Sequence, residues 1–189
     1  VLGVKQAQLG YELMDRKRNI LIREMVSLSD AAAELKESLE NTFSEAYSAL
    51  RTANIVCGVI TDDVKRIPED NGIELSVRSV MGVELPTVIH EKGKPQLRYS
   101  LTETNSRFDM AYISFAKAKD MSIKLAEIEN SIYRLSVAIR KTQKRANALK
   151  NIVIPTYREQ VKFITSALEE KEREEFSRQK IIKATKYKK

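Results

Sequence analysis

The stretch that decides the fold is residues 11–57, YELMDRKRNILIREMVSLSDAAAELKESLENTFSEAYSALRTANIVC, which contains neither glycine nor proline. Residues 96–154 form a second stretch without either residue. Four of the six glycines and three of the four prolines lie between the two stretches, in residues 58–95. Glycine and proline are the main breakers of helices, so their absence permits helices far longer than the usual length of about 12 residues. The sequence therefore predicts two long helices joined by a short insert.

Apolar residues recur along the first long segment at alternating steps of three and four, the spacing of the stripe along which two helices pack in a coiled coil. We call this stripe the seam. Interrupted only by Arg18, the first seam consists of Val4, Ala7, Tyr11, Met14, Leu21, Met25, Leu28, Ala32, Leu35, Leu39, Phe43, Ala46, Leu50, Ala53 and Cys57. Two consecutive steps of four, at Leu35, Leu39 and Phe43, form a stutter that locally relaxes the left-handed supercoil. Because Cys57 lies on the seam, we expect it to be a small buried apolar residue.

The second long segment carries a matching seam. It consists of Ala111, Phe115, Ala118, Met121, Leu125, Ile128, Ile132, Leu135, Ile139, Thr142, Ala146, Leu149, Val153, Tyr157, Val161, Ile164 and Leu168. Residues 100–103, SLTE, fit a capping box and predict that the second helix begins there. Pro155 lacks a backbone N–H group and its ring clashes with the preceding turn, so a kink is predicted near this residue.

Each long segment has one narrow apolar stripe and needs a partner to cover it, and the other segment of the same chain is the nearest one. We therefore expect a mainly α fold, a long antiparallel two-helix coiled coil with a small insert at one end. The predicted parts are residues 1–57 (first helix), 58–100 (insert) and 101–189 (second helix with a basic tail). Because the second helix is longer, part of its seam should be covered by a preceding N-terminal stretch or by another protein.

The insert has a different pattern. Apolar and polar residues alternate over residues 73–78, IELSVR, as in a half-buried strand. A second strand is expected in residues 83–89 or 97–99, after a turn at Met81-Gly82 or at residues 92–95. We expect a small β-hairpin, which must lean on the helices or on another protein because an isolated hairpin is marginally stable in water.

The sequence offers no arrangement of residues for catalysis. His90 is the only histidine, so neither a metal site nor a catalytic triad can be assembled around it, and we expect it at the surface. The glycines are too far apart for a phosphate-binding loop. A two-helix coiled coil also lacks the concave, water-excluding site that acid–base chemistry needs. We expect a non-enzymatic protein without cofactor or metal, and, since no run of 18 apolar residues occurs, without a membrane span.

The formal net charge is +7, and basic residues form two clusters on the long segments. They are Arg16, Lys17 and Arg18 in the first segment, and Arg140, Lys141, Lys144 and Arg145 in the second. Nucleic-acid binding would call for interleaved aromatic residues or a recognition-helix motif, and neither is present. An acidic protein surface is the preferred partner. Two other readings stay open: a free-standing coiled-coil scaffold or adaptor, and a basic helical nucleic-acid-binding protein.

Several patches resemble the D subunit of the V-type and A-type rotary ATPases. Residues 142–155, TQKRANALKNIVIP, are similar to the C-terminal signature of that family, as are residues 168–176, LEEKEREEF, with the KIIK of residues 180–183. Residues 10–18, GYELMDRKR, resemble its N-terminal stretch, and residues 80–86, VMGVELP, a short central motif. The patches occur in the order in which the family has them.

The resemblance implies a non-catalytic central-stalk protein that turns inside a catalytic hexamer. In the family the paired terminal helices enter the hexamer, the central insert meets a socket protein above the membrane ring, and a small F subunit docks on the coiled coil. ATP hydrolysis then drives proton or sodium transport, or ion flow drives ATP synthesis. The chain is expected to be cytoplasmic, on the periphery of a membrane-bound complex. Candidate partner contacts are Arg16, Lys17, Arg18, Arg140, Lys144, Arg145, Asn147, Pro155, Arg173, Phe176 and Arg178.

Overall fold

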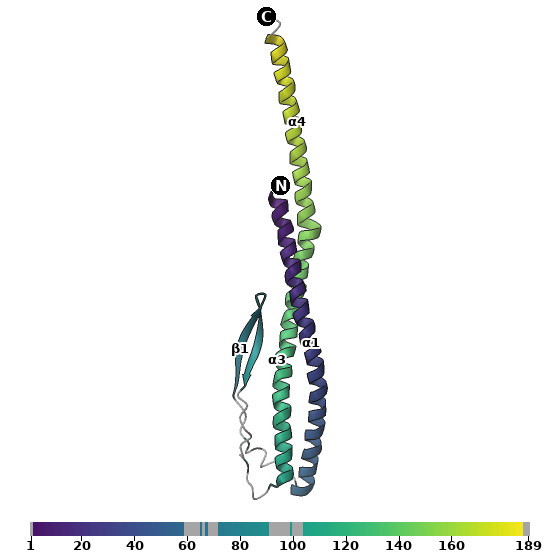
Figure 1. The fold of residues 1–189 in the computed structure, drawn as a ribbon, viewed down its shortest axis with the longest axis vertical. Coiled ribbons are helices and arrows are strands. Elements are labelled where there is room, and N and C mark those ends of the chain that lie inside the picture. Colours follow the sequence, from purple (N-terminus) through teal and green to yellow (C-terminus); the bar gives the residue numbers. More distant parts are fainter. Residues whose placement is uncertain are drawn as a thin grey trace. The chain divides into compact units, whose positions relative to one another are not determined.

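The computed structural model describes residues 2–58, 65, 67, 72–90, 99 and 104–186. Two long helical segments with an antiparallel hairpin between them confirm the predicted mainly α fold (Figure 1). The elements in chain order are α1 (Leu2–Cys57), β1 (Ile73–Val80), β2 (Val83–His90), α3 (Ser106–Ala148), the π-helical turn η1 (Leu149–Val153) and α4 (Ile154–Lys186).

The chain divides into two units, which are described separately. The terminal unit consists of Val1–Asn19 and Arg140–Lys189, and the hairpin unit of Ile20–Ile139. In the hairpin unit α1 and α3 lie side by side along the predicted seams. Every seam residue from Val4 to Cys57 and from Ala111 to Val153 is buried or half-buried.

Three contacts between α1 and α3 show that the helices of the hairpin unit are antiparallel. The Thr42 hydroxyl lies 3.5 Å from the Met121 sulfur. The Tyr47 and Phe115 rings meet edge to face at 5.4 Å, and Ala53 packs with Phe108 in one cluster. As the residue number rises on α1 it falls on α3. Ala46, Ala53 and Ala118 are fully buried, so small side chains stand where the two backbones approach closely.

Two polar residues, Thr42 and Ser131, are buried in this unit although neither belongs to the predicted seams. Thr42 donates a hydrogen bond from its hydroxyl to the Ser38 carbonyl oxygen at 2.8 Å. Since this shorter bond stays within the same helix, the hydroxyl does not depend on its weaker contact with the Met121 sulfur across the seam. A hydroxyl of this kind can therefore be buried in an apolar interface at little cost. A prediction that classes residues only as polar or apolar would place it at the surface.

The hairpin is held against the helices by its core residue Leu85. β1 pairs with β2 from Ile73 opposite His90 to Val80 opposite Val83. Met81 and Gly82 have φ angles of 51° and 74°, as a two-residue type I′ turn requires. Leu85 packs with Leu21 of α1 and Leu135 of α3, and all three are 0–1% exposed. The hairpin prediction is confirmed, together with its turn at Met81-Gly82 and its dependence on the helices.

The other predictions for the insert fall largely outside the described residues. These are the alternative turn at residues 92–95, residues 97–98 of the alternative strand, and the capping box at residues 100–103. The predicted helix start was wrong, because α3 begins at Ser106. The Asn105 side chain accepts a hydrogen bond from the Arg107 N–H group at 2.9 Å, so Asn105 caps the helix.

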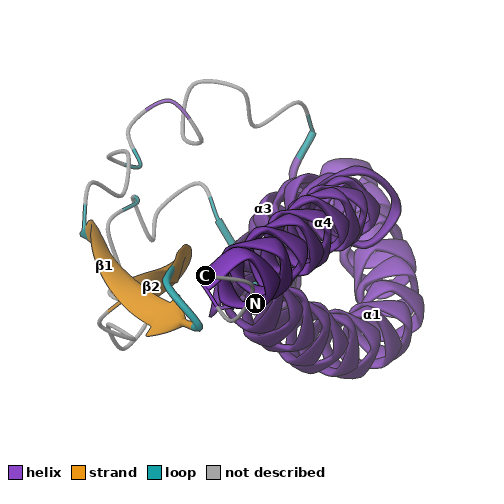
Figure 2. Ribbon diagram, turned by 90° about the horizontal axis from the view of Figure 1, so that it is seen from above, coloured by secondary structure: helices purple, strands orange, loops and turns teal. Residues whose placement is uncertain are grey.

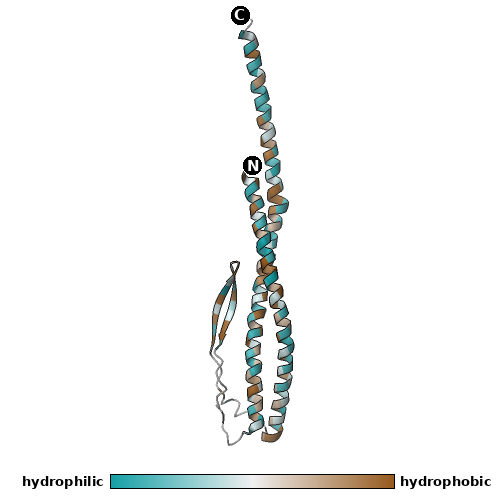
Figure 3. Ribbon diagram, in the orientation of Figure 1, coloured by the Kyte–Doolittle hydropathy of each residue, from teal (hydrophilic) through white to brown (hydrophobic). Residues whose placement is uncertain are grey.

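The terminal unit pairs the beginning of α1 with the end of α3, η1 and the beginning of α4, again antiparallel. A Cβ atom added at Gly3 would lie 3.7 Å from the Tyr157 ring, and one at Gly10 would lie 3.8 Å from Leu149. Both distances are ordinary van der Waals contacts, so the two segments pack against each other there and an alanine would also fit. Beyond this region the seam is uncovered: Ile164 and Leu168 are 55% and 56% exposed. Figure 3 shows hydrophobic residues recurring along α4 among hydrophilic ones.

The helix changes its hydrogen bonding just before Pro155. η1 is a π-helical turn of five residues, and the Ile154 N–H group bonds to the Leu149 carbonyl oxygen, five residues back. Proline cannot donate to the residue four positions earlier and its ring crowds that carbonyl group. A π-turn is a common way to absorb such a local mismatch and one of the recognised causes of helix kinks. The predicted kink at Pro155 stays a prediction, now with a physical cause.

Candidate functional site

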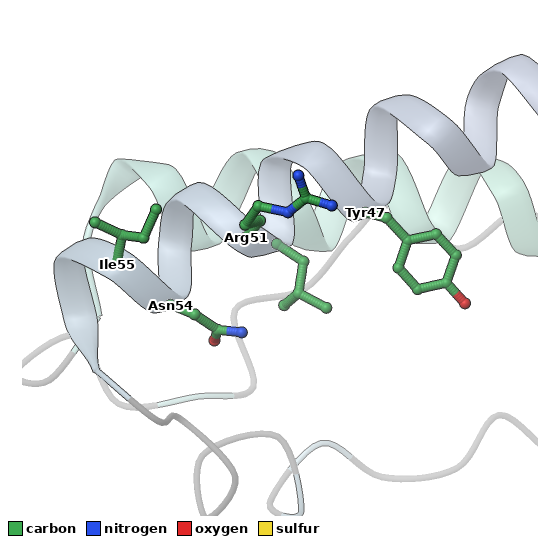
Figure 4. A pocket seen from close by; sticks show the side chains of 5 residues that line it. Tyr47, Arg51, Asn54 and Ile55 are labelled. Carbon is green, nitrogen blue, oxygen red and sulfur yellow. The ribbon is translucent and has the colours of Figure 1, made fainter.

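One pocket among the described residues is a shallow depression in the hairpin unit. It has a volume of about 490 Å³ and is lined by Tyr47, Leu50, Arg51, Asn54 and Ile55. Figure 4 shows these side chains on successive turns of α1 alone. One helix does not supply the convergent walls that exclude water from a reacting group. Chemistry at this depression is therefore not supported, and surfaces become the relevant candidates.

The candidate contact residues predicted from the sequence all lie in the terminal unit. Arg16, Lys17 and Arg18 are on α1, while Arg140, Lys144, Arg145 and Asn147 are on α3. Pro155, Arg173, Phe176 and Arg178 are on α4. The structure thus separates them into two groups, one around the helix pair and one along α4.

The antiparallel pairing brings the two basic clusters to the same level of the terminal unit. The Arg18 guanidinium donates a hydrogen bond to the Gln143 side-chain oxygen at 2.9 Å, so one cluster meets the middle of the other. We call the joined set the cationic collar. It consists of Arg16, Lys17, Arg18, Arg140, Lys141, Lys144 and Arg145.

Few acids balance the charge of the collar. Residues 140–150 contain five basic residues and no acidic one. On α1 the nearest carboxylate, Asp15, is already paired with Arg18 at 2.6 Å. The side chains of Arg16, Arg140, Lys144 and Arg145 are exposed. Clustered cations of this kind attract an acidic surface and speed its approach, and exposed pairs stay sensitive to salt.

The second group lies on the exposed length of α4. Phe163 and Phe176 are 75% and 60% exposed, and the Lys180 ammonium sits 4.8 Å from the Phe176 ring centroid. Arg178 lies 3.8 Å from Glu174, one helical turn away. When several large apolar side chains are exposed close together, another molecule often covers them. The exposed length of α4 is therefore a candidate contact surface, with its apolar side chains spread around the helix.

The expectation of a surface histidine was wrong. The side chain of His90 is only 12% exposed, and its Nε2 atom lies 3.5 Å from the Asp120 carboxylate of α3. Its Nδ1 atom lies 3.4 Å from the Gly72 carbonyl oxygen. His90 is the last residue of β2, and packing of the hairpin on α3 covers it. The periodicity of the sequence could not predict the burial of His90, because the residues that cover it are distant in sequence.

Sequence reasoning also missed the residues that fasten the hairpin to the helices. Glu127 accepts a hydrogen bond from the Val88 N–H group at 3.1 Å. Arg134 donates to the Glu84 carbonyl oxygen at 3.2 Å, and Arg78 of β1 pairs with Glu24 of α1 at 2.9 Å. Figure 2 shows the hairpin beside α3 in the end-on view. In the sequence, the charged residues Glu24, Arg78, Glu127 and Arg134 are not distinguishable from ordinary solvent-exposed residues.

At the base of the insert, Tyr99 is tied to the start of α3. Its hydroxyl group donates a hydrogen bond to the Asp109 carboxylate at 2.5 Å, and its ring packs edge to face on Phe108 at 4.6 Å. Burial first, and then the hydrogen bond to Asp109, raise the pKa of Tyr99 from 10.0 to about 12. The contact is structural, since it joins the insert to the cluster of Ala53 and Phe108.

In the described part of the chain, two long paired helices with a fastened β-hairpin define a helical-hairpin protein. None of the described helices is both long and apolar enough to cross a membrane. A family model described as that of the ATP synthase D subunit matches residues 3–184. The chain belongs to the ATP synthase D-subunit family.

Similar proteins bear the same name in bacteria and archaea. The chain is 42% identical to the V-type ATP synthase D subunit of Thermotoga neapolitana over 92% of its own length and 87% of the relative's. It is 37% identical to the A-type ATP synthase D subunit of Pyrococcus furiosus, over 96% and 87% of the two lengths. With the A-type protein of the same name from Methanopyrus kandleri it shares 35% identity over 95% and 79%. The family resemblance predicted from the sequence is confirmed.

Proposed function

We propose that the chain is the non-catalytic central rotor shaft of a V/A-type rotary ATPase. It would transmit torque between a catalytic hexamer that hydrolyses or makes ATP and a membrane ring that moves protons or sodium ions. The observation that carries the proposal is the cationic collar, where two sequence-distant basic clusters meet on paired helices. Membership of the D-subunit family supports it.

A shaft must resist twisting and must present different surfaces to the parts around it. Paired helices with buried seams resist torsion because side chains on each helix fill spaces on the other. α1 alone has 56 residues, a length of about 80 Å at 1.5 Å per residue. The collar, the π-turn before Pro155 and the exposed length of α4 differ from one another in charge and shape. Such differences let surrounding catalytic interfaces meet different contacts as the shaft turns.

The parts of the chain would take different partners. The terminal unit would contact the hexamer, with the collar facing acidic residues of the ring and the exposed length of α4 lying inside it. The insert, proposed as residues 58–100, would meet a socket protein above the membrane ring, and a small F subunit would dock on the helix pair. The chain itself would hold no nucleotide, and the assembly would lie on the cytoplasmic side of the membrane.

The test is charge reversal in the collar of the reconstituted ATPase. Replacing Arg140, Lys144 and Arg145 with Glu should leave ATP hydrolysis running while ion transport per ATP falls several-fold, because repulsion replaces attraction at the contact. A matched control reverses three exposed lysines of the hairpin unit, Lys36, Lys117 and Lys124, and should lower that ratio much less. Equal ratios for wild type and the collar variant would count against the proposal.

A free-standing scaffold is the competing reading, favoured only by the general suitability of coiled coils for that purpose. Affinity purification of the chain from its own cells separates the two. A rotor shaft should recover a hexameric ATPase with one copy of the chain and one of a small companion protein. A nucleic-acid-binding protein would instead show DNA affinity falling steeply with salt.

A further inference from the structure

The two edges of the hairpin differ in what covers them. On β2 the outward backbone groups are used by α3. The Val88 N–H group donates to the Glu127 carboxylate at 3.1 Å, and the Glu84 carbonyl oxygen accepts from the Arg134 guanidinium at 3.2 Å. The helix therefore occupies this edge of the hairpin.

The outer edge of β1 is open. In the ladder Leu75 stands opposite Val88, and Ser79 stands opposite Glu84. In an antiparallel ladder every second pair is not hydrogen-bonded, and its two members turn their N–H and C=O groups away from each other. Because the groups of Val88 and Glu84 point outward, those of Leu75, Val77 and Ser79 do so on the other edge. Nothing in the described part of the chain bonds to them.

β1 lacks the features that usually protect an open edge. Proteins blunt such edges with proline, a bulge or a covering element. β1 contains no proline and pairs regularly with β2 over its whole length. The first seven of its eight residues are exposed. An open and regular edge of this length is a template for another strand.

The side chains of β1 also suit an added strand. Ile73, Leu75 and Val77 lie on the same face of the hairpin, because alternate residues of a strand share a face. They are 45%, 74% and 60% exposed. Aliphatic side chains on adjacent strands stabilise a sheet by packing against each other. An incoming strand should therefore carry apolar residues opposite Leu75 and Val77.

The charges of β1 decide which kind of partner fits. Arg78, its only basic residue, is already paired with Glu24 of α1 at 2.9 Å. Glu74 is exposed, and its neighbour across the hairpin is the apolar Ile89. The edge thus keeps one negative charge for which the described residues supply no ion pair, and a lysine or arginine on the incoming strand would complement it. A second copy of this chain does not supply that cation, because its own Arg78 is engaged in the same way.

We propose that the β1 edge binds an extended segment of a different protein, which adds a third, antiparallel strand to the hairpin. The segment has apolar residues opposite Leu75 and Val77 and a basic residue opposite Glu74. Antiparallel pairing is slightly more stable per residue than parallel pairing. The inference does not depend on the rotor function.

The position of the hairpin leaves space for the added strand. α3 lies along the β2 edge, and Figure 2 shows β1 on the side of the hairpin away from the helices. The new strand would lie about 4.8 Å beyond β1. A hairpin is marginal as a two-stranded sheet, and a third strand stabilises it. One strand buries little surface, so an isolated segment is expected to bind weakly.

A synthetic peptide tests the proposal on the full-length chain. The probe is the acetylated and amidated peptide TTVTVKV, whose antiparallel register places its lysine opposite Glu74 and its valines opposite Ile73, Leu75 and Val77. The control peptide has proline in place of the valine opposite Leu75. It lacks the N–H group that would donate to the Leu75 carbonyl oxygen, and should bind about tenfold more weakly in fluorescence anisotropy.

Amide hydrogen exchange shows which backbone groups gain a partner. With the probe bound, the amides of Leu75, Val77 and Ser79 should exchange about tenfold more slowly, because their outward N–H groups become hydrogen-bonded. The amides of Ser76 and Arg78 are already bonded within the hairpin and should change much less. This alternation distinguishes strand pairing from a surface that merely covers the side chains.

A pair of variants tests the same contact from the side of the chain. Val77→Pro removes an outward N–H group, and its neighbour on β2 is already Pro86, so the hairpin itself loses no ladder bond. The variant should bind the probe about tenfold more weakly, whereas Val77→Thr should bind it nearly as well as wild type. Unchanged circular dichroism verifies that both variants fold. The proline peptide probes the neighbouring bond with the wild-type chain, so the test does not depend on the variant.

Charge exchange tests the ion pair and the register together. Glu74→Lys should weaken binding of the probe about fivefold, because attraction becomes repulsion across the strands. A peptide with glutamate in place of the lysine should show the reverse preference and bind the Glu74→Lys chain better than wild type.

Three results would overturn the proposal: the outward amides gain no protection, the proline peptide binds as tightly as the probe, or the charge preference does not reverse. Protection of the same amides that rises with the concentration of the chain alone also overturns it, because the added strand would then come from a second copy.

Discussion

The hairpin unit has a buried core to which three elements contribute, whereas nearly all of α4 in the terminal unit is exposed. In the hairpin unit Leu21, Leu85 and Leu135 are 0–1% exposed and join three elements. In the terminal unit Phe163 and Ile181 of α4 are 75% and 68% exposed. Both units are built from the same coiled-coil pattern. The difference teaches that the pattern specifies a helix with an apolar face, while a partner decides whether that face is buried.

The largest expected effect comes from breaking the core of the hairpin unit. Leu135→Ala removes a fully buried side chain that contacts both α1 and β2, and should lower the free energy of unfolding by about 2–5 kcal/mol. Leu168→Ala, at an exposed seam position of α4, should change it by less than about 0.5 kcal/mol. Urea denaturation followed by circular dichroism measures both. A similar loss of unfolding free energy for the two variants would contradict the difference between the units.

Pro155→Ala is the substitution in the terminal unit that most directly tests the cause of the π-turn. It restores a helical N–H group and removes the ring that crowds the preceding turn, so η1 should convert to α-helix. Resistance of residues 149–157 to local opening should rise by about 1–3 kcal/mol, measured by hydrogen exchange. In the assembled ATPase we expect weaker coupling of hydrolysis to transport. Unaltered exchange and coupling would show that proline is not the cause of the π-turn.

Removing one fastener of the hairpin should have a smaller effect. Glu127→Ala leaves the Val88 N–H group without its carboxylate partner, a charge-assisted bond, and should destabilise the hairpin by about 1–2 kcal/mol. Exchange of the Val88 amide hydrogen should accelerate accordingly. Glu24→Ala is the control, because its pair with Arg78 is exposed and such pairs contribute about 0–1 kcal/mol. Equal acceleration by both variants would contradict the assignment.

The smallest effect is a dependence of stability on alkaline pH. The pKa of Tyr99 is raised from 10.0 to about 12, first by burial and then by the Asp109 hydrogen bond. The unfolded chain therefore ionises at lower pH than the folded one, so the stabilisation is complete below pH 10 and is lost as pH rises toward 12. Tyr99→Phe should flatten this decline in denaturation curves taken between about pH 9 and 12. An identical decline in the variant would place its origin elsewhere.

The sequence pattern predicted the helices, the seams and a hairpin, and gave the Met81-Gly82 turn as one of two alternatives. It placed Leu39 and Ala53 on the buried face, and each is buried. It did not place Thr42 or Ser131 there, because both are polar; the Thr42 hydroxyl is buried at little cost since it bonds within its own helix. It also put the start of the second helix too early, since a capping box is only one of several sequences that can cap a helix and Asn105 serves instead.

The candidate site was predicted only as separate pieces. The residues of the cationic collar were recognisable as two clusters, yet their union depends on how the helices are paired, which Arg18 and Gln143 reveal. Nothing in the sequence around Glu127 and Arg134 indicated that they hold the hairpin. Nothing around His90 indicated that it would be partly buried. Each of these contacts joins residues that are far apart along the chain, and no short repeat in the sequence relates one to the other.

By itself the sequence determined two long helices with apolar stripes and a short strand pair, because exclusion of glycine and proline and regular side-chain spacing act over neighbouring residues. Tertiary structure alone decided which edge of the hairpin is covered, that the histidine is partly buried against α3, and that the basic clusters meet. Those outcomes depend on close packing and directional hydrogen bonds between distant segments, and such interactions are specified by geometry in space and not by periodicity along the chain.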